Sequence, residues 1–498
     1  MLVANVRLLR LLMTVCIVGM LSYLYLDTLL VMRWAPTNAR HPDTTSPGDA
    51  DAPTNDSKDT GFNVLDYVNG PPTVQVSENL RNDTSYITAF ADFGFTNEMM
   101  NDVNLIYLAI LSSRVPVIPP HVPMHVGPSS EVGILPFGDV WDIERLREQT
   151  GVPILEWRDV KSEDSIELDL LGCWTAWASA WSRNGNPRGS GLNWSLHVDI
   201  SYTPIPDNAK LMNNHYAFHA VAALGFPDGR REGIIQGAWA HDDPTPFPSP
   251  HKHVVLPPDE RLMCLDLVYY LGGSAAFEWE KDYSPAWRFV GKHLRWNARV
   301  LRVVDVSLRR LWSVPPGQDV PKYIAIHIRH GDFGNGCNGQ KDTCYAPLSV
   351  IAEYVDRIRR QLLDASSDPA EKFDHILLTS DEKDPAFWEE VKRRGWSHFD
   401  WAKDNWAVNE EEIEAESPTS GPPPPKIHPK WWPTLIDAAC QSLSAGFVGT
   451  QQSTMSLVAL RRVQDWHGGV GVMVPFGPGM YPQGQGLSIS KQGEAALT

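Results

Sequence analysis

The sequence lacks two common nucleotide-binding signatures. It has no Gly-Lys-Ser/Thr phosphate loop, and its glycines at 331, 334 and 336 run G-x-x-G-x-G, the reverse of the dinucleotide fingerprint. These absences argue against a P-loop site and against a nicotinamide-dependent oxidoreductase. Positive charge is also scarce, since 43 Lys and Arg stand against 60 Asp and Glu, a formal net charge of −17. Such a chain repels nucleic-acid backbones, so we expect no nucleic-acid partner, and an anionic ligand requires a local cluster of cations.

Cysteine is scarce too, with six in 498 residues. Cys337 and Cys344 lie close together in a loop rich in Gly, Asn and Asp, and we expect them to form a small disulfide, with two free thiols as the alternative. Cys16 lies in an apolar run near the N-terminus. The other three cannot all pair, and the sequence leaves their pairing open: Cys173, Cys264 and Cys440.

The N-terminus lacks a cleavage site of the small-x-small type. An apolar run over residues 11–32, interrupted only at Asp27 and Thr28, is just long enough to span a bilayer as a helix. We therefore expect a transmembrane signal anchor behind a cytoplasmic tail of residues 1–10, rather than a cleaved signal peptide. Residues 33–80 are rich in Pro, Asp, Thr, Ser and Asn, which predicts a flexible stem.

Three Asn-x-Ser/Thr sequons are candidates for glycosylation if the large C-terminal part is lumenal: Asn55, Asn82 and Asn193. Such tripeptides also arise often by chance. Together with the predicted anchor, they lead us to expect a single-pass type II protein of the Golgi or endoplasmic reticulum membrane.

Strands alternate with helices in both halves of the chain. In the first half, strands at Tyr86–Ala91 and Val115–Ile118 flank a helix whose apolar residues recur at i, i+3, i+4 and i+7. The second half has strands beginning at Tyr323, at His375 and at Phe447, and helices follow them. This order predicts an α/β fold with two doubly wound, Rossmann-like domains, residues 81–313 and 314–483. Residues 404–430 are expected to form an acidic, proline-rich loop and residues 484–498 a tail.

Charged side chains gather where the strand beginning at Tyr323 ends. Period-two alternation places His327 and Arg329 on one face, and ligands of parallel sheets bind outside the carboxyl ends of strands. The guanidinium offers a fork of donors that fits phosphate oxygens. The alternative is an ion pair between Arg329 and Asp332, with His327 as an ordinary hydrogen-bonded residue. For Asp332 that structural role is the favoured interpretation.

A hydroxyl-rich turn follows the last predicted strand, which ends at Gly449. Thr450, Ser453 and Thr454 precede an apolar helix. Hydroxyls and free N–H groups at a helix start can bind phosphate oxygens, although such residues often serve only as helix caps.

Three motifs in chain order resemble those of the GDP-fucose protein O-fucosyltransferase family: H-x-R-x-G-D-F at 327–333, TSD at 379–381 and FVGTQQSTMS at 447–456. The segment GFTNEMMND, from Gly94 to Asp102, is similar to the family's Gly-x-x-Asn turn. The resemblance covers about residues 86–480. Two positions depart from it: His330 stands where many members have a second arginine, and Glu98 follows Asn97 where a neutral or basic residue is common.

The resemblance implies a GT-B fold, in which two Rossmann-like domains face each other and the C-terminal one holds most of the GDP-sugar. It implies contacts of Arg329 with the β-phosphate and of His327 with the nucleotide. It implies further substrate contacts for Asp381 at the guanosine end, for Ser453 and Thr454 at the diphosphate, and for the turn of Gly94 and Asn97 at the sugar or phosphate.

From this resemblance we expect an inverting transfer of fucose from GDP-fucose to a hydroxyl of a protein or glycan, in which Arg329 stabilises the leaving diphosphate. We expect no cofactor and no metal, because the one trusted Asp-x-Asp motif, Asp49 and Asp51, lies in the predicted stem. Glu98 is the candidate general base, with a surface or capping role as the alternative. A membrane-anchored, non-catalytic nucleotide-sugar or glycan-binding protein is the alternative function.

Overall fold

The computed structural model describes residues 62–177, 186–226, 245–281, 283–315, 317–339, 341–401 and 426–481. The predicted tail, anchor and most of the stem lie outside these residues, as do Asn55, the greater part of the acidic loop and the C-terminal tail. Among the described helices, none is both long and apolar enough to cross a bilayer. The membrane anchor and the Golgi or endoplasmic reticulum location stay predictions.

The N-terminal lobe is built on a parallel sheet with the strand order β3-β2-β1-β7-β4-β5. Its strands are β1 (Tyr86–Ala89), β2 (Val115–Ile118), β3 (Leu155–Glu156), β4 (Asp169–Thr175), β5 (Val198–Pro204) and β7 (Leu262–Leu265). A parallel two-stranded sheet of β6 (Tyr216–Ala217) and β8 (Leu271–Gly272) accompanies it. The helices of this lobe are α2 (Val76–Asn79), α3 (Phe95–Ser112), α4 (Ser129–Val132), α5 (Ile143–Thr150), α6 (Trp157–Val160), α8 (Gly191–Ser195), α9 (Phe218–Ala223) and α11 (Pro285–Phe289). Helix α12 (Ala298–Trp312) then connects it to the C-terminal lobe.

The prediction of a stem through residue 80 is wrong for residues 62–80. Val68, Val76 and Leu80 are buried in the same apolar cluster as Tyr86 of β1, and the Tyr86 hydroxyl donates to the carbonyl of Tyr67 at 2.6 Å. Apolar residues are as frequent as polar ones in residues 62–80, and a few of them are enough to join the core of the N-terminal sheet.

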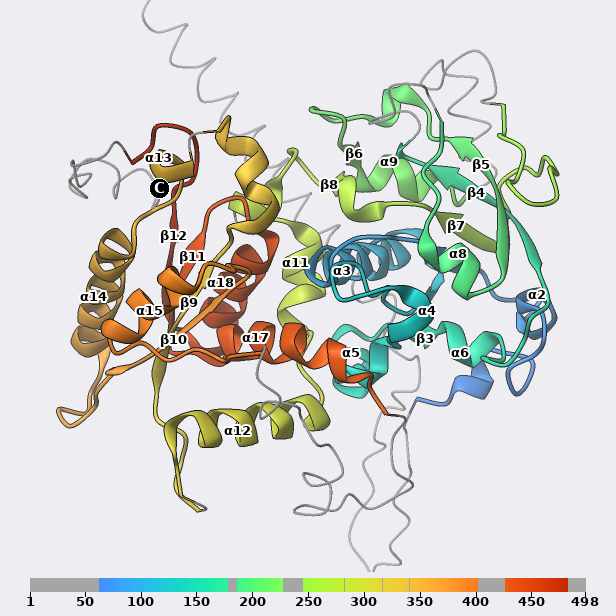
Figure 1. Ribbon diagram of the computed structural model, residues 1–498. Helices are drawn as coiled ribbons and strands as arrows, with labels where there is room; N and C mark the ends of the chain where they lie inside the picture. Colours follow the sequence, from blue (N-terminus) through green and yellow to red (C-terminus); the bar gives the residue numbers. More distant parts are fainter. Residues whose placement is uncertain are drawn as a thin grey trace, which may run out of the picture.

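The C-terminal lobe contains a parallel sheet with the strand order β10-β9-β11-β12. Its strands are β9 (Tyr323–Ile328), β10 (His375–Ser380), β11 (Gly446–Thr450) and β12 (Val470–Val474), and its helices are α13 (Lys341–Cys344), α14 (Leu348–Ala365), α15 (Pro385–Arg393), α17 (Trp432–Leu443) and α18 (Thr454–His467). The expected α/β fold with two parallel sheets is confirmed, and the two lobes lie side by side (Figure 1).

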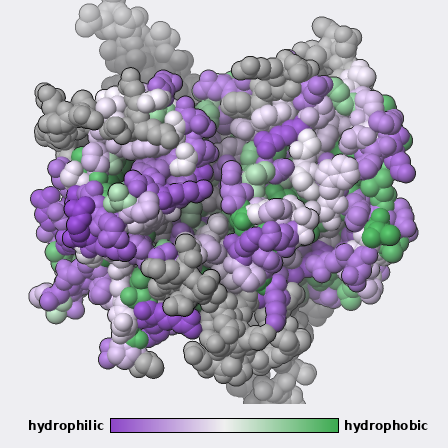
Figure 2. All heavy atoms as spheres, viewed as in Figure 1, coloured by the Kyte–Doolittle hydropathy of each residue, from purple (hydrophilic) through white to green (hydrophobic). Residues whose placement is uncertain are grey.

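Alternation along β9 explains how helices cover both faces of this sheet. Ile324, Ile326 and Ile328 belong to the cluster that contains the buried residues of α14, whereas Tyr323 and Ala325 belong to the cluster that contains those of α17 and α18. Because successive side chains point to opposite faces, His327 lies on the α18 side. Figure 2 shows a recess between the lobes on the viewed face, and hydrophilic side chains dominate the surface of the C-terminal lobe there.

An aromatic junction connects the lobes. The rings of Trp141 and Trp296 stack with their centroids 4.3 Å apart, and Phe95 stacks on Trp141 at 5.8 Å. From the C-terminal lobe, Trp431 meets Phe95 edge to face, and the Arg462 guanidinium of α18 lies within 5 Å of both Trp141 and Trp296. These contacts combine large buried apolar area with cation–π attraction, so residues of both lobes share one core.

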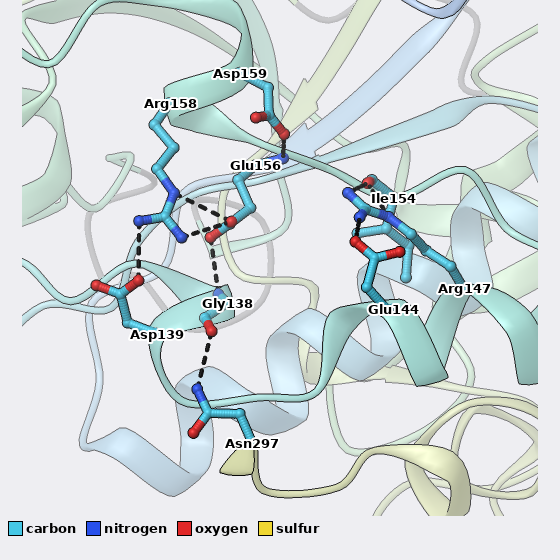
Figure 3. A network of polar contacts seen from close by, with 9 residues as sticks. All are labelled: Gly138, Asp139, Glu144, Arg147, Ile154, Glu156, Arg158, Asp159 and Asn297. Atoms are coloured by element: carbon cyan, nitrogen blue, oxygen red, sulfur yellow. Dashed lines mark hydrogen bonds and ion pairs between the residues drawn. The ribbon is translucent and has the colours of Figure 1, made fainter. Parts of the chain in front are cut away.

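A polar network supports the chain where it leaves the N-terminal lobe (Figure 3). Glu156 accepts from the backbone of Gly138 and pairs with Arg158, which also pairs with Asp139. Asn297 donates to the carbonyl of Gly138 and caps α12 by accepting from the backbone of Val300. The predicted domain boundary falls after α12, but this helix packs against α17 of the C-terminal lobe, because its buried face, including Val304 and Leu308, completes the shared core.

Two disulfides lie within the described residues. Cys337 is bonded to Cys344 beside the end of β9, and Cys173 of β4 is bonded to Cys264 of β7. The Cys173–Cys264 bond links two neighbouring strands that lie 91 residues apart in sequence. Cys440 is buried with a free thiol.

Candidate functional site

Each of the two larger sheets has a position where the chain order of its strands reverses. In the C-terminal sheet, β9 is followed by β10 on one side, and β11 then lies on the other side of β9. In the N-terminal sheet, β2 and β3 lie on one side of β1 and the later strands lie on the other. Ligands of doubly wound sheets bind outside the carboxyl ends of strands at such switch points. Arg329 follows β9, the 450–454 turn follows β11, and Gly94 follows β1, so the predicted residues lie at these two positions.

The guanidinium of Arg329 lies between two carboxylates. One terminal nitrogen is 2.7 Å from Oδ1 of Asp332, and the other is 2.6 Å from Oδ2 of Asp381. The Arg329 side chain is 28% exposed, so it is reachable from solvent while its charge is balanced. The ion pair with Asp332 that the sequence offered as the structural alternative is therefore present. The structure adds Asp381 as a second partner of the same cation.

His327 is buried between β9 and α18. Its Nδ1 lies 2.7 Å from Oγ of Ser456, which accepts from the backbone N–H of Thr450. The serine hydroxyl thus links the imidazole to the backbone of the turn. Burial, with a smaller contribution from Arg329, lowers the pKa of His327 to about 3, so the ring is neutral at physiological pH. His327 therefore positions the turn rather than supplying a positive charge.

The hydroxyls of the turn after β11 are mostly engaged. Thr450 Oγ1 donates to the carbonyl of His327 and accepts from the backbone N–H of Arg329. Ser453 caps α18 by accepting from the backbone of Ser456. Among the described residues, no hydrogen bond engages the side chain of Thr454, the first residue of α18. The helix start therefore retains hydrogen-bonding capacity toward a ligand, where its dipole favours negative charge.

Gln452 gives this turn its shape. Its φ is +68°, in the left-handed region, and the backbone N–H of Ser453 donates to the carbonyl of Thr450. A residue other than glycine in this region costs free energy, and such residues cluster at functional sites.

Beside Arg329 lies a cluster of aromatic and acidic side chains that the sequence did not predict. We call it the wall, and it consists of His330, Phe333, Tyr345, Glu382 and Phe476. The His330 ring lies against Tyr345, with centroids 4.0 Å apart, and its Nδ1 contacts Oε2 of Glu382 at 2.5 Å. Phe333 and Tyr345 both contact the ring of Phe476, which follows β12. Along the sequence, only the segment FGNGC at 333–337 indicated these contacts, because Tyr345, Glu382 and Phe476 come from separate segments.

The Cys337–Cys344 disulfide braces this wall. It bonds Cys337, the last residue of the 3-10 helix that carries Asp332 and Phe333, to Cys344, the residue before Tyr345. The loop is also tied to the end of the described chain, because the backbone of Tyr481 donates to the carbonyl of Thr343 and that of Gly477 donates to Cys344.

Gly94 and Asn97 lie at the start of α3, as the Gly-x-x-Asn pattern predicts. Gly94 is the N-cap of α3 in an extended conformation, and the backbone N–H of Asn97 donates to the Gly94 carbonyl. Asn97 is half-buried, and its Oδ1 has no hydrogen-bond partner among the described residues. The turn therefore holds an amide oxygen that is buried without a partner at the switch point of the N-terminal sheet.

Glu98, the predicted general base, is buried rather than open to the recess. It is 3% exposed, and its carboxylate accepts from the backbone of Val122 at 3.0 Å and from that of Phe93 at 3.4 Å. His121 and Asp102 complete a buried cluster with it. Burial, followed by the charge of Asp102, raises the pKa of Glu98 well above its usual value. The contacts give Glu98 a structural role, in which it holds the loops after β1 and β2 to α3, but its burial excludes the surface position that the sequence also offered.

The two described sequons differ in exposure. Asn82 lies in an exposed turn, where its Oδ1 accepts from Arg261. Asn193 is half-buried within α8. Glycosylation of either residue stays a prediction. Within the described residues, no group of three or more His, Cys, Asp or Glu side chains is placed to hold a metal ion.

No protein-family model matches the chain, and no curated protein matches its sequence. The chain is similar to solved fucosyltransferase structures. The crystal structure of POFUT1 in complex with GDP-fucose has a TM-score of 0.43 at 13% identity, covering 80% of this chain and 99% of that one. Its apo form has a TM-score of 0.42 with the same identity and coverage. The selenomethionine fucosyltransferase NodZ from Bradyrhizobium has a TM-score of 0.33 at 13% identity, covering 76% of this chain and 91% of that one. At these values the likeness carries no conclusion about activity.

Proposed function

We propose that the protein is an inverting, metal-independent fucosyltransferase of the GT-B type that uses GDP-fucose as donor and a protein or glycan hydroxyl as acceptor. The observation that carries the proposal is the place of Arg329, a partly exposed cation at the switch point of the C-terminal sheet, next to the start of α18. In a chain of net charge −17, the Arg329 guanidinium and the start of α18 are the positive groups proposed to meet a diphosphate, once the donor displaces a carboxylate from the guanidinium. The motif resemblance supports the choice of fucose.

The wall beside Arg329 supports a guanine nucleotide. A carboxylate can accept from both the N1–H and the exocyclic amine of guanine, whereas adenine offers no such pair of donors. Asp381 and Glu382 supply carboxylates here, and the rings of Phe333, Tyr345 and Phe476 supply surfaces on which a base can stack. In this proposal, the base lies against the wall, and the diphosphate lies between Arg329 and the α18 start.

Arg329 would act on the leaving group. Cleavage of the bond between fucose and GDP adds negative charge to the β-phosphate, and a cation fixed there before the reaction lowers the barrier. The donor must then replace at least one carboxylate that holds the guanidinium. Asp332 is the better candidate to leave, because it is 56% exposed, whereas Asp381 is 28% exposed and also accepts from the backbone of His330.

The test is nucleotide release from a panel of nucleotide sugars by the purified protein. We expect release of GDP from GDP-fucose, and a fall of at least about 100-fold in R329A, because loss of one such contact costs on the order of 3 kcal/mol. The matched control is R309A, since Arg309 is 26% exposed and ion-paired with Asp305 on α12, outside the site. Equal release by wild type and R329A would contradict the role of Arg329. Stabilisation by GDP without any release would favour the non-catalytic alternative.

A further inference from the structure

The turn after β2 holds an exposed histidine in an unfavourable conformation. Residues Pro123 to Val126 form a β-turn in which the backbone N–H of Val126 donates to the carbonyl of Pro123 at 2.9 Å. His125 occupies the third position of this turn with a φ of +66°. This position of a type II turn favours glycine or asparagine, because other side chains are strained there. Among the described residues, no hydrogen bond or ion pair engages the His125 ring.

This turn lies next to the Gly-x-x-Asn turn. Gly94 pairs with Met124 in a parallel bridge, and a Cβ placed on Gly94 would lie 3.4 Å from Cδ2 of the His125 ring. Both turns follow neighbouring parallel strands, β1 and β2, so they lie at the same carboxyl edge of the N-terminal sheet. The imidazole therefore lies beside the turn that carries Asn97.

The same turn reaches the C-terminal lobe. A Cβ on Gly127 would lie 3.6 Å from Cδ of Lys430, which also pairs with Glu131 of α4. On the other side of Gly94, Phe95 meets Trp431. His125 is thus held at the boundary between the lobes, where an acceptor must enter to reach a donor bound on the C-terminal lobe.

The carboxylates on this edge are engaged elsewhere. Glu98 and Asp102 are buried, and burial raises the pKa of each well above its usual value. Asp92 accepts from the backbone of Gly191 through Oδ2. His121 is 1% exposed, and burial lowers its pKa to about 3. An exposed neutral imidazole can take a proton from a bound hydroxyl.

We propose that His125 is the general base that deprotonates the acceptor hydroxyl, an inference that rests on the proposed fucosyl transfer. A ring nitrogen of the neutral imidazole takes the acceptor proton as the acceptor oxygen bonds to the anomeric carbon of fucose. The bond from that carbon to GDP breaks, and its electron pair goes to the β-phosphate oxygen that Arg329 faces. The left-handed backbone of His125 directs its ring toward Gly94, which accounts for a histidine at a position that suits glycine.

H125G is the sharpest variant, because glycine removes the imidazole and adopts the φ of this turn without strain. The assay is GDP release from GDP-fucose in buffer, where water is the acceptor, with and without added azide. Azide is an anion that attacks without losing a proton, so it bypasses a missing base. The matched control is H253G, since His253 is also exposed with a φ of +54° but lies in a turn tied to Asp199, near the amino end of β5.

We expect release with water to fall at least about 100-fold in H125G and azide to restore it, while H253G behaves as wild type. Stabilisation by GDP should be equal in all three proteins, because His125 does not hold the nucleotide. Unchanged release with water in H125G would overturn the assignment, and so would a loss that azide does not restore. A wild-type protein that neither binds GDP nor releases it from GDP-fucose would instead contradict the proposed function, and this assignment with it.

Discussion

The carboxylate of Asp381 packs directly on the backbone of Gly331, so closely that a methyl group at that glycine would overlap its Oδ2. Oδ1 of the same carboxylate accepts from the backbone of His330 at 2.8 Å, and Oδ2 pairs with Arg329. Gly331 therefore allows one carboxylate to hold both the backbone and the cation at the end of β9.

G331A should disrupt this arrangement. The new methyl group forces Asp381 away from Arg329 and His330, so we expect GDP affinity to fall about tenfold and the free energy of unfolding to fall by about 1–3 kcal/mol. Calorimetric titration and chemical denaturation measure the two effects. G336A is the control, because it lies in the same 3-10 helix and its methyl group would meet only the ring of Phe476, at 3.9 Å. Equal affinities of the two variants would show that the contact is not needed.

D332N should bind GDP more tightly than wild type. Asp332 competes with the phosphates for Arg329, and the neutral amide competes less, so we expect a decrease in Kd of about threefold to tenfold. D356N is the control, because Asp356 forms the same i, i+3 pair with Arg359 on α14, away from the site. Weaker GDP binding in D332N would indicate that Asp332 positions the arginine for the donor, against the role proposed for it.

E98Q should keep most of its activity. Burial raises the pKa of Glu98, which favours the neutral carboxyl, and the amide of glutamine has a similar shape and keeps an oxygen acceptor for the backbone N–H of Val122. We expect turnover within about twofold of wild type, whereas E98A should lose about 1–3 kcal/mol of stability because the backbone N–H of Val122 loses its acceptor. A well-folded E98Q without turnover would make Glu98 the base and exclude His125 from that role.

H327Q should be less sensitive to acid than wild type. The pKa of His327 is lowered to about 3, against about 6.5 in the unfolded chain, so the unfolded state takes up the proton first. The stability that this histidine contributes is present above about pH 6.5 and is lost as the pH falls toward 3. Between pH 7.5 and 5.5, wild type should lose about 1.4 kcal/mol more than H327Q in urea unfolding. H253Q, at an exposed histidine, should behave as wild type, and a parallel decline in H327Q would contradict the assignment.

Local signals predicted individual elements well. Asp142 caps α5 and Gly151 ends it in the left-handed conformation, and these residue types are the favoured ones at such positions. The end of β9, with Arg329 just beyond it, and the cap of α18 at Ser453 also follow from the sequence. These features depend on residues within one or two turns of each other, so a short window contains their physical cause.

Long-range pairing could not be predicted in the same way. β7 lies between β1 and β4 although some 87 residues separate it from β4, and this placement is what brings Cys264 beside Cys173. The wall of the site likewise joins Phe333, Glu382 and Phe476 from three segments. The burial of Glu98 depends on the loop after β2, which supplies both its backbone donor and His121. None of these contacts can be identified from residues that lie close together in the sequence.

The aromatic junction also bears on how the molecule responds to heat. Phe95 has ring partners from both lobes, Trp141 and Trp431. Trp296 stacks on Trp141 and donates to Ser442 of α17. If either half unfolded alone, the aromatic rings of the other half would lose the partners that bury them and would be exposed to water. The two sheets should therefore come apart together, as one calorimetric peak rather than two.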